Sequence, residues 1–203
     1  MTDGAVGGFL EAILRDGSLS EEVVGRALWL VPFVRTVSVV NEVKVLLRSR
    51  PELALAAGNT LGQLADRALA PSLAETLLDP TVSAESRAGA AYALGAIGDV
   101  STKSALVKAL RTAGQQPIVL DRVAEALGYL HEEARDAVDD LCALLTADSP
   151  EVRYAALCAL GNINATEALE RVEHLIDDNS VSKYGHVGET AIRVAEAFRA
   201  PRQ

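Results

Sequence analysis

The chain has 203 residues, of which 49% are hydrophobic and only 4% aromatic, so its apolar mass is mostly Ala, Leu and Val. This length allows an adequate core without disulfides or metal ions, and the 23% of charged residues is typical of globular proteins. The 28 acidic and 19 basic side chains give a net charge of −9, which argues against a surface that binds nucleic acid or anionic lipid.

The first 50 residues predict helices, with neither a leader peptide nor a membrane span. Lys and Arg are absent before Arg15, and Gly and Glu interrupt the apolar stretch, so a secretory signal is not expected. The most apolar window, residues 23–47, contains charged residues and a proline, which predicts buried core helices and no transmembrane helix. The Val-rich segment 37–45 alternates like a strand, but its helical neighbours favour a buried helix.

A Leu-Gly pair recurs every 33 residues through the middle of the chain. The pairs are Leu61-Gly62, Leu94-Gly95, Leu127-Gly128 and Leu160-Gly161, and one further step back leads to Leu28. A small or branched apolar residue stands four positions before each Leu, and a large apolar residue stands two positions after each Gly. Three columns that share one period indicate an internal repeat of a stacked architecture.

Each repeat predicts two helices. In the unit around residue 150, Ser149 is the expected N-cap and Pro150 the first helical residue. Apolar residues then follow at intervals of three and four as far as Ile163, where Gly and Asn residues suit a helix end. A second helix is expected from about Thr166. In an earlier unit, Ser49 and Glu52 fit a capping box in which Pro51 takes the same helix-start role.

Both ends of the chain depart from this period, as terminal units of a stack do because each has only one neighbour. Trp29 stands where the later units have Gly, and the last apolar segment, 191–198, aligns only with an offset of two residues. We therefore expect one domain over 1–203. Its N-terminal capping helices would cover about 1–30, its regular repeats about 31–176, and a divergent C-terminal repeat about 177–200.

Two segments resemble the short HEAT repeat of the phycobilin-lyase-like type. They are Asp148-Ser-Pro-Glu-Val-Arg, which continues to Leu160-Gly161-Asn-Ile163, and Arg87-Ala-Gly-Ala-Ala-Tyr-Ala-Leu-Gly-Ala-Ile-Gly-Asp99. The resemblance covers about residues 20–200. It implies an all-α fold, a right-handed α-solenoid of about five to six helical pairs in an armadillo-like superhelix. The Thr-Pro-Leu-His signature of ankyrin repeats is absent, and the aromatic positions of tetratricopeptide repeats are not filled.

The sequence predicts no catalytic constellation, no metal site and no cofactor. Its histidines are His131, His174 and His186, and the single His131-Glu132 pair is too little for the paired iron ligands of the HEAT family that includes deoxyhypusine hydroxylases. Residues 131–133 are expected to form a solvated loop. Cys142 and Cys158 lie among Ala and Leu, so both are expected to be buried and reduced, in a cytoplasmic protein.

We expect a binding ridge on the concave face of the stack. It would be formed by the side of each first helix that faces away from the core. Tyr is favoured on such surfaces because a rigid ring combines apolar area with a hydroxyl, although a Tyr can also simply fill space between helices. The mildly acidic, polar and aromatic ridge suits a basic or amphipathic protein segment. The predicted partner-binding residues are Asn59, Gln63, Tyr92, Glu125, Tyr129, Tyr154 and Asn162.

Three functions are compatible with this pattern. The first is a noncatalytic scaffold that binds another protein or peptide through its concave face. The second, implied by the family resemblance, is a lyase-like or other enzyme-accessory protein that handles a small molecule or cofactor such as a tetrapyrrole. The third, nucleic-acid binding, is disfavoured by the net charge of −9. The sequence leaves open the partner, any enzymatic role, the oligomeric state and the role of the 177–188 loop.

Overall fold

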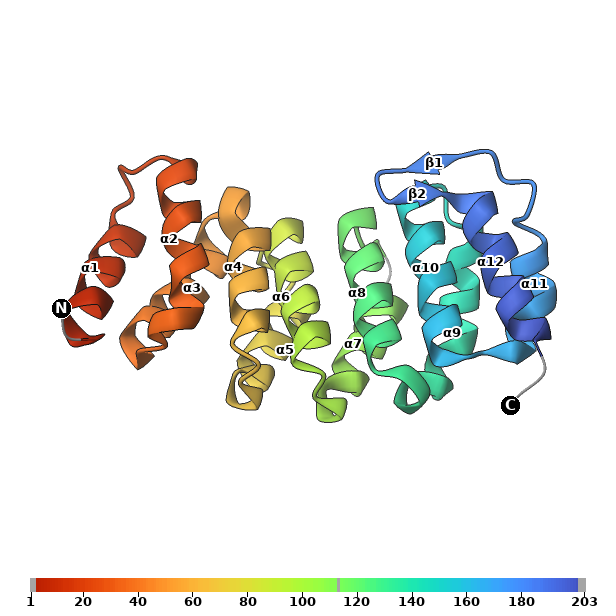
Figure 1. The fold of residues 1–203 in the computed structure, drawn as a ribbon, viewed down its shortest axis with the longest axis horizontal. Helices are drawn as coiled ribbons and strands as arrows, with labels where there is room; N and C mark the ends of the chain where they lie inside the picture. Colours follow the sequence, from red (N-terminus) through yellow and green to blue (C-terminus); the bar gives the residue numbers. More distant parts are fainter. Residues whose placement is uncertain (1–2, 113, 201–203) are drawn as a thin grey trace. The chain divides into compact units, whose positions relative to one another are not determined.

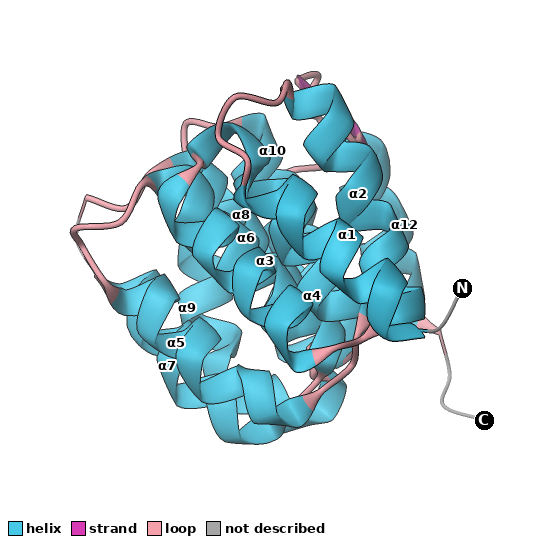
Figure 2. Ribbon diagram, turned by 90° about the vertical axis from the view of Figure 1, so that its left-hand side faces the viewer, coloured by secondary structure: helices cyan, strands magenta, loops and turns pink. Residues whose placement is uncertain are grey.

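The computed structural model describes residues 3–112 and 114–200, and nearly all of them belong to helices or to the short loops between helices (Figures 1 and 2). Strand structure among these residues is limited to one small hairpin, drawn in magenta in Figure 2. The chain divides into two compact units, Met1–Ile97 and Gly98–Gln203. The predicted all-α class is therefore confirmed. No helix in the described part of the chain is long and apolar enough to cross a membrane.

Unit 1 is a stack of helices in which α2 packs against α4, and α4 packs along α6. The Val-rich segment forms α3 and not a strand, as predicted, with Val39 and Val43 buried and Val37 and Val45 exposed. The helices of unit 1 are α1 (Asp3–Arg15), α2 (Glu21–Val34), α3 (Val37–Ser49), α4 (Ala54–Gln63), α5 (Ala70–Leu78) and α6 (Ala84–Ile97), with 3-10 turns at Pro51–Leu53 and Arg67–Leu69.

Unit 2 repeats this arrangement, with α8 packed along α10 and α10 packed against α12. Its α-helices are α7 (Lys103–Arg111), α8 (Pro117–Tyr129), α9 (Val138–Ala143), α10 (Pro150–Ile163), α11 (Leu169–Glu173) and α12 (Val187–Arg199). Its 3-10 segments are Val100–Thr102, His131–Ala137, Leu144–Thr146 and Thr166–Ala168. The strands β1 (Val181–Ser182) and β2 (Gly185–His186) form the antiparallel hairpin, in which Val181 pairs with His186.

The columns of the 33-residue period form the cores of both units. The side chains of the Leu column, from Leu28 to Leu160, are at most 1% exposed. The column four residues earlier is equally buried, and the column two residues after each Gly is nearly so. Burial of one large aliphatic side chain contributes roughly 1.5–3 kcal/mol, so the period records the positions that stabilise the stack most.

Helix boundaries agree with the sequence in one repeat and differ in another. The Ser149 hydroxyl accepts a hydrogen bond from the Val152 amide, and α10 ends at the left-handed residue Asn164, as predicted. The capping box expected at Ser49 is wrong. Ser49 is the last residue of α3, and its hydroxyl donates to the Val45 carbonyl, 2.8 Å away. Pro51 then opens a short 3-10 turn, so the helical position of Ser49 prevents it from capping α4.

The glycines of two Leu-Gly pairs, Gly62 and Gly128, let the neighbouring helix come close. A Cβ atom at Gly128 on α8 would lie 2.9 Å from the Cα of Ala159 on α10, and one at Gly62 would lie 2.7 Å from the Cβ of Ala96 on α6. Non-bonded contacts under 3.0 Å are essentially never made by real Cβ atoms. Trp29 holds the same position on α2, where its indole is 66% exposed and lies against Phe33.

Replacing Leu127 or Leu160 by Ala is expected to lower the free energy of unfolding by about 2–5 kcal/mol, because each change leaves a cavity in a fully packed core. Urea melts would measure this loss. Leu55→Ala is the matched control, since that side chain is 37% exposed and its removal should cost far less. Melts of Leu127→Ala and Leu160→Ala that match the wild type would refute the role assigned to the Leu column.

Gly128→Ala is expected to lower the free energy of unfolding by about 1–3 kcal/mol, because α8 and α10 must separate to accept the methyl group. Gly25→Ala supplies the opposite control. Nothing lies within 4 Å of a Cβ at Gly25 in α2, so the gain in helix propensity should stabilise the protein by about 0.5–1 kcal/mol. Thermal or urea unfolding of both variants would test the prediction, and equal shifts would contradict it.

Candidate functional site

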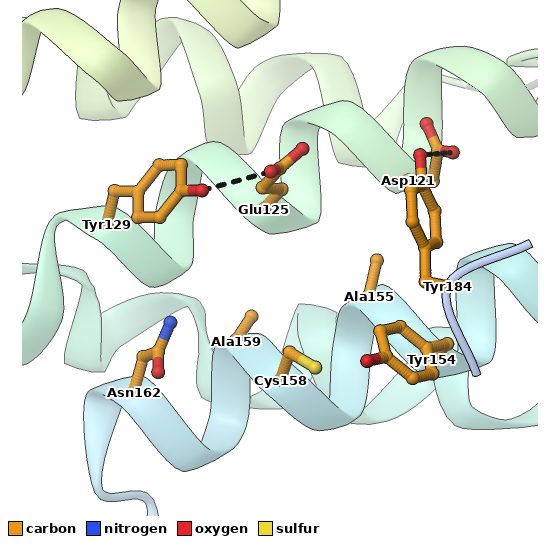
Figure 3. A pocket seen from close by; sticks show the side chains of 9 residues that line it. All are labelled: Asp121, Glu125, Tyr129, Tyr154, Ala155, Cys158, Ala159, Asn162 and Tyr184. Carbon is orange, nitrogen blue, oxygen red and sulfur yellow. Dashed lines mark hydrogen bonds between the residues drawn. The ribbon is translucent and has the colours of Figure 1, made fainter. Parts of the chain in front are cut away.

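Helices α8 and α10 present two matching stripes of side chains to a small pocket in unit 2 (Figure 3). Asp121, Glu125 and Tyr129 follow one another at intervals of four on α8, so they share one face of that helix. Their equivalents one period later, Tyr154, Cys158 and Asn162, lie on the facing side of α10. Ala155, Ala159 and Tyr184 complete the lining of this cavity of about 200 Å³, the α8–α10 pocket.

Tyr184 reaches the pocket because the 177–188 loop is folded back onto α10. The Arg153 guanidinium of α10 holds the loop by donating to Asp178 at 2.8 Å and to the Ser180 hydroxyl at 2.7 Å. The turn of the hairpin is then closed by Ser182, whose hydroxyl donates to the Gly185 carbonyl at 2.9 Å. The extra residues that break the repeat period thus supply one wall of the pocket.

Asp121 is the most unusual group in the pocket, because its side chain is 3% exposed and incompletely paired. Its Oδ2 atom lies 3.5 Å from both the Tyr184 hydroxyl and the Lys183 ammonium. Its Oδ1 atom is buried and has no hydrogen-bond partner among the described residues. Burial raises the pKa of Asp121, and the positive charges of Arg122 and Lys183 offset only part of that effect. A buried carboxylate that lacks a full set of partners is costly to the fold.

Glu125, one turn along α8, is by contrast well paired. Its carboxylate accepts hydrogen bonds from the Arg122 guanidinium at 2.6 Å and from the Tyr129 hydroxyl at 3.0 Å. Arg122 also lies 5.6 Å from the centre of the Tyr184 ring, and Lys183 lies 4.7 Å from it. The two carboxylates are therefore set among aromatic rings, one of which, that of Tyr184, already contacts two cations.

Cys158 was expected to be buried, and the structure corrects that expectation. Cys142 is buried, whereas Cys158 is only partly so, because it belongs to the stripe of α10 that faces the pocket. Both are free thiols. Burial raises the pKa of the Cys158 thiol, while a hydrogen bond from Tyr154 acts in the opposite direction. The thiol is therefore neutral at pH 7 and poorly suited to act as a nucleophile.

Four of the seven residues predicted for the ridge line this pocket: Glu125, Tyr129, Tyr154 and Asn162. The other three belong to unit 1, where Asn59 and Gln63 are exposed on α4 and Tyr92 is half-buried on α6. The prediction missed Asp121, although its position 33 residues before Tyr154 marks it as part of the same stripe. It also missed Tyr184, which lies in the irregular loop where the period gives no guidance.

The histidines contribute nothing to the pocket. Residues 131–133 are exposed as expected, but they begin a 3-10 helix and do not form a loop; the Nδ1 atom of His131 lies 3.3 Å from the Asn162 carbonyl oxygen. Within residues 3–112 and 114–200, no three His, Cys, Asp or Glu side chains come together in a way that could hold a metal ion.

Two family models match the chain and confirm the resemblance drawn from its sequence. The model for HEAT repeats matches residues 112–193, and the model for the PBS lyase HEAT-like repeat matches residues 86–112. The chain therefore carries HEAT repeats of the phycobilin-lyase-like type, and its stacked helical pairs belong to the all-α, solenoid-forming class. No curated protein matches the chain in sequence.

Several solved structures share this fold. One is the complex of CpcE and CpcF of phycocyanin lyase from Nostoc sp. PCC7120, with 22% identity over 93% of this chain and 74% of that chain, and a TM-score of 0.63. An engineered protein matches with 23% identity over 98% of this chain and 97% of its own, and a TM-score of 0.62. A second engineered protein matches 98% of this chain with a TM-score of 0.59. At such identities the likeness concerns the fold alone.

Asp121→Asn is expected to raise the urea midpoint of unfolding at pH 7. The folded-state pKa of this carboxyl lies above its unfolded value of about 3.9, so ionised Asp121 destabilises the fold at neutral pH. As the pH falls through the pKa of Asp121 in the folded state toward its pKa in the unfolded state, the carboxyl becomes protonated and this destabilisation is lost. The gain from the substitution should therefore shrink between pH 7 and pH 4.

The control is Asp177→Asn, which removes the same charge from an exposed loop position and should change the free energy of unfolding by no more than about 0.5 kcal/mol. A lower midpoint for Asp121→Asn at pH 7 would show that its partners more than offset its burial.

Proposed function

We propose that this chain is a noncatalytic HEAT-repeat scaffold that binds a protein partner, and that the α8–α10 pocket is part of the binding surface. The observation that carries this proposal is the concentration of three tyrosines, two on the helices α8 and α10 and one in the hairpin turn, around two carboxylates of α8. Tyrosines in such positions are typical energetic centres of protein interfaces. In unit 1, the exposed Asn59 and Gln63, together with Tyr92, are proposed as separate contacts to the partner.

The chemistry of the pocket supports recognition better than catalysis. The Cys158 thiol has a raised pKa, and its neighbour Tyr154 donates a hydrogen bond to it and is no base. Glu125 is neutralised by Arg122 and is also bonded to Tyr129. A nucleophile with an adjacent general base, the usual requirement for covalent catalysis, is not found among the residues that line the pocket.

An enzyme-accessory role that handles a small molecule is the second candidate. It is favoured by the match to the PBS lyase HEAT-like repeat and by the likeness to the CpcE–CpcF complex of phycocyanin lyase. Against it stands the size of the pocket. Sites for drug-sized ligands usually measure about 300–1,000 Å³, whereas the α8–α10 pocket measures about 200 Å³. That volume suits a side chain of a partner better than a tetrapyrrole.

Tyr129→Ala and Tyr92→Ala are each expected to weaken partner binding by about 1–3 kcal/mol, because interface energy is concentrated in a few aromatic residues. The partner would first be captured from a cell extract with the tagged wild-type chain, identified by mass spectrometry and purified. Its affinity for each variant would then be measured by calorimetry. Tyr129 is 44% exposed, so circular dichroism should show an unchanged fold for its Ala variant.

The matched control is Lys108→Ala, an exposed change on α7, away from the proposed surface. The proposal fails if the two Tyr variants are folded and retain full affinity for the partner while Lys108→Ala loses it.

A further inference from the structure

We infer that the α8–α10 pocket receives one arginine side chain of the protein partner. The inference rests on the proposed function and deepens it, by assigning a chemical class to the group that enters this pocket. It is drawn from the hydrogen-bonding capacity of the lining, from the incomplete pairing of Asp121 and from the size of the cavity.

The pocket offers mainly hydrogen-bond acceptors. The hydroxyl of each tyrosine has a single proton, and in each case that proton is directed at another group of the pocket: Tyr129 donates to Glu125, Tyr184 to Asp121 and Tyr154 to the Cys158 sulfur. Ionised carboxylates only accept. Apart from the amide of Asn162, the lining thus presents lone pairs, and a ligand that matches it must supply N–H donors.

The incomplete pairing of Asp121 indicates that the group of the ligand that enters the pocket is a cation. One of its oxygens is buried without a partner among the described residues, and the other is 3.5 Å from its nearest donors. A charge-assisted hydrogen bond is ordinarily about 2.7–2.9 Å long, so the ammonium of Lys183 only partly satisfies this carboxylate. The Lys183 side chain is 49% exposed and free to turn toward solvent when another cation approaches.

The aromatic walls favour a guanidinium over other cations. The rings of Tyr154 and Tyr184 lie 5.7 Å apart and are inclined by 31°. The Tyr184 ring already attracts cations, with the Arg122 guanidinium 5.6 Å and the Lys183 ammonium 4.7 Å from its centre. A planar guanidinium stacks on such rings while its five N–H donors point outward in the ring plane, toward carboxylates. Asp121 and Glu125, one helical turn apart on α8, are placed to accept those donors (Figure 3).

The cavity of about 200 Å³ holds one extended side chain and excludes a helix or a strand of the partner. An arginine that entered it would bring its aliphatic stem against Ala155 and Ala159, which form the floor between the two polar stripes. These two methyl groups are therefore suitable reporters of occupancy.

The test is a titration of the full chain, labelled with ¹³C in its alanine methyl groups, with N-acetyl-arginine amide. The control ligand is N-acetyl-citrulline amide, which has the same length and planar end group but no charge. We expect the Ala155 and Ala159 signals to shift with the arginine compound, and the citrulline compound to bind about tenfold more weakly or not at all. Equal binding of the two compounds would overturn the inference.

Two substitutions make the result specific to the site. Asp121→Asn and Glu125→Gln keep the shapes of the side chains and are each expected to weaken arginine binding by about fivefold or more. Glu196→Gln removes the same charge from an exposed position on α12 and should leave the affinity unchanged. A similar loss in all three variants would mean that only the net charge attracts the ligand, and the inference would fall.

Further ligands distinguish the source and type of the cation. Tighter binding of free arginine than of the blocked compound would indicate a metabolite, and equal binding of N-acetyl-lysine amide would indicate any ammonium; either result overturns the assignment to a partner's arginine. The outcome is separable from the proposed function. If Tyr129→Ala still weakens partner binding while no arginine compound shifts the reporters, the scaffold role stands and this inference fails.

Discussion

The close approach of successive helices is the constraint on which the rest of the structure depends. At Gly62 and Gly128 a single added carbon atom would collide with the neighbouring helix, whose nearest residues at those points are Ala96 and Ala159. The leucines one position earlier, Leu61 and Leu127, are fully buried, each in the core of its own unit. Each helical pair is too small to bury its own apolar face, so stability comes from the contact between pairs.

The same packing leaves the opposite face of α8 and α10 available for recognition. Because the two helices are held close together by small residues, the stripes on either side of their contact form a narrow cavity, and the hairpin closes one end of it. Asp121 lies at that end, where burial raises the pKa of its carboxyl although the charges of Arg122 and Lys183 oppose the rise. A buried carboxylate with a raised pKa is typical of a functional position, because its burial does not add to the stability of the fold.

The sequence predicts the core better than the site, for physical reasons. The core positions repeat every 33 residues because each faces the same neighbour in each unit, so periodicity alone identifies Leu127, Leu160 and their equivalents. The stripe residues Glu125, Tyr129 and Asn162 follow from the same geometry. Tyr184 does not, because its position depends on how Arg153 anchors an irregular loop, and no local pattern records that contact. The cap at Ser49 failed because a polar residue near a proline can end one helix as readily as begin the next.

The equivalence of the two stripes has a consequence for how such a surface changes over evolutionary time. Three pairs of positions are equivalent in successive repeats but hold different residues. They are Asp121 and Tyr154, Glu125 and Cys158, and Tyr129 and Asn162. The leucine column of the repeat, Leu127 and Leu160 in these two helices, is buried in the core on the other side of each helix. Selection can therefore change the binding specificity of the surface one side chain at a time while the architecture stays the same. Equivalent positions of successive repeats then become binding sites for different ligands.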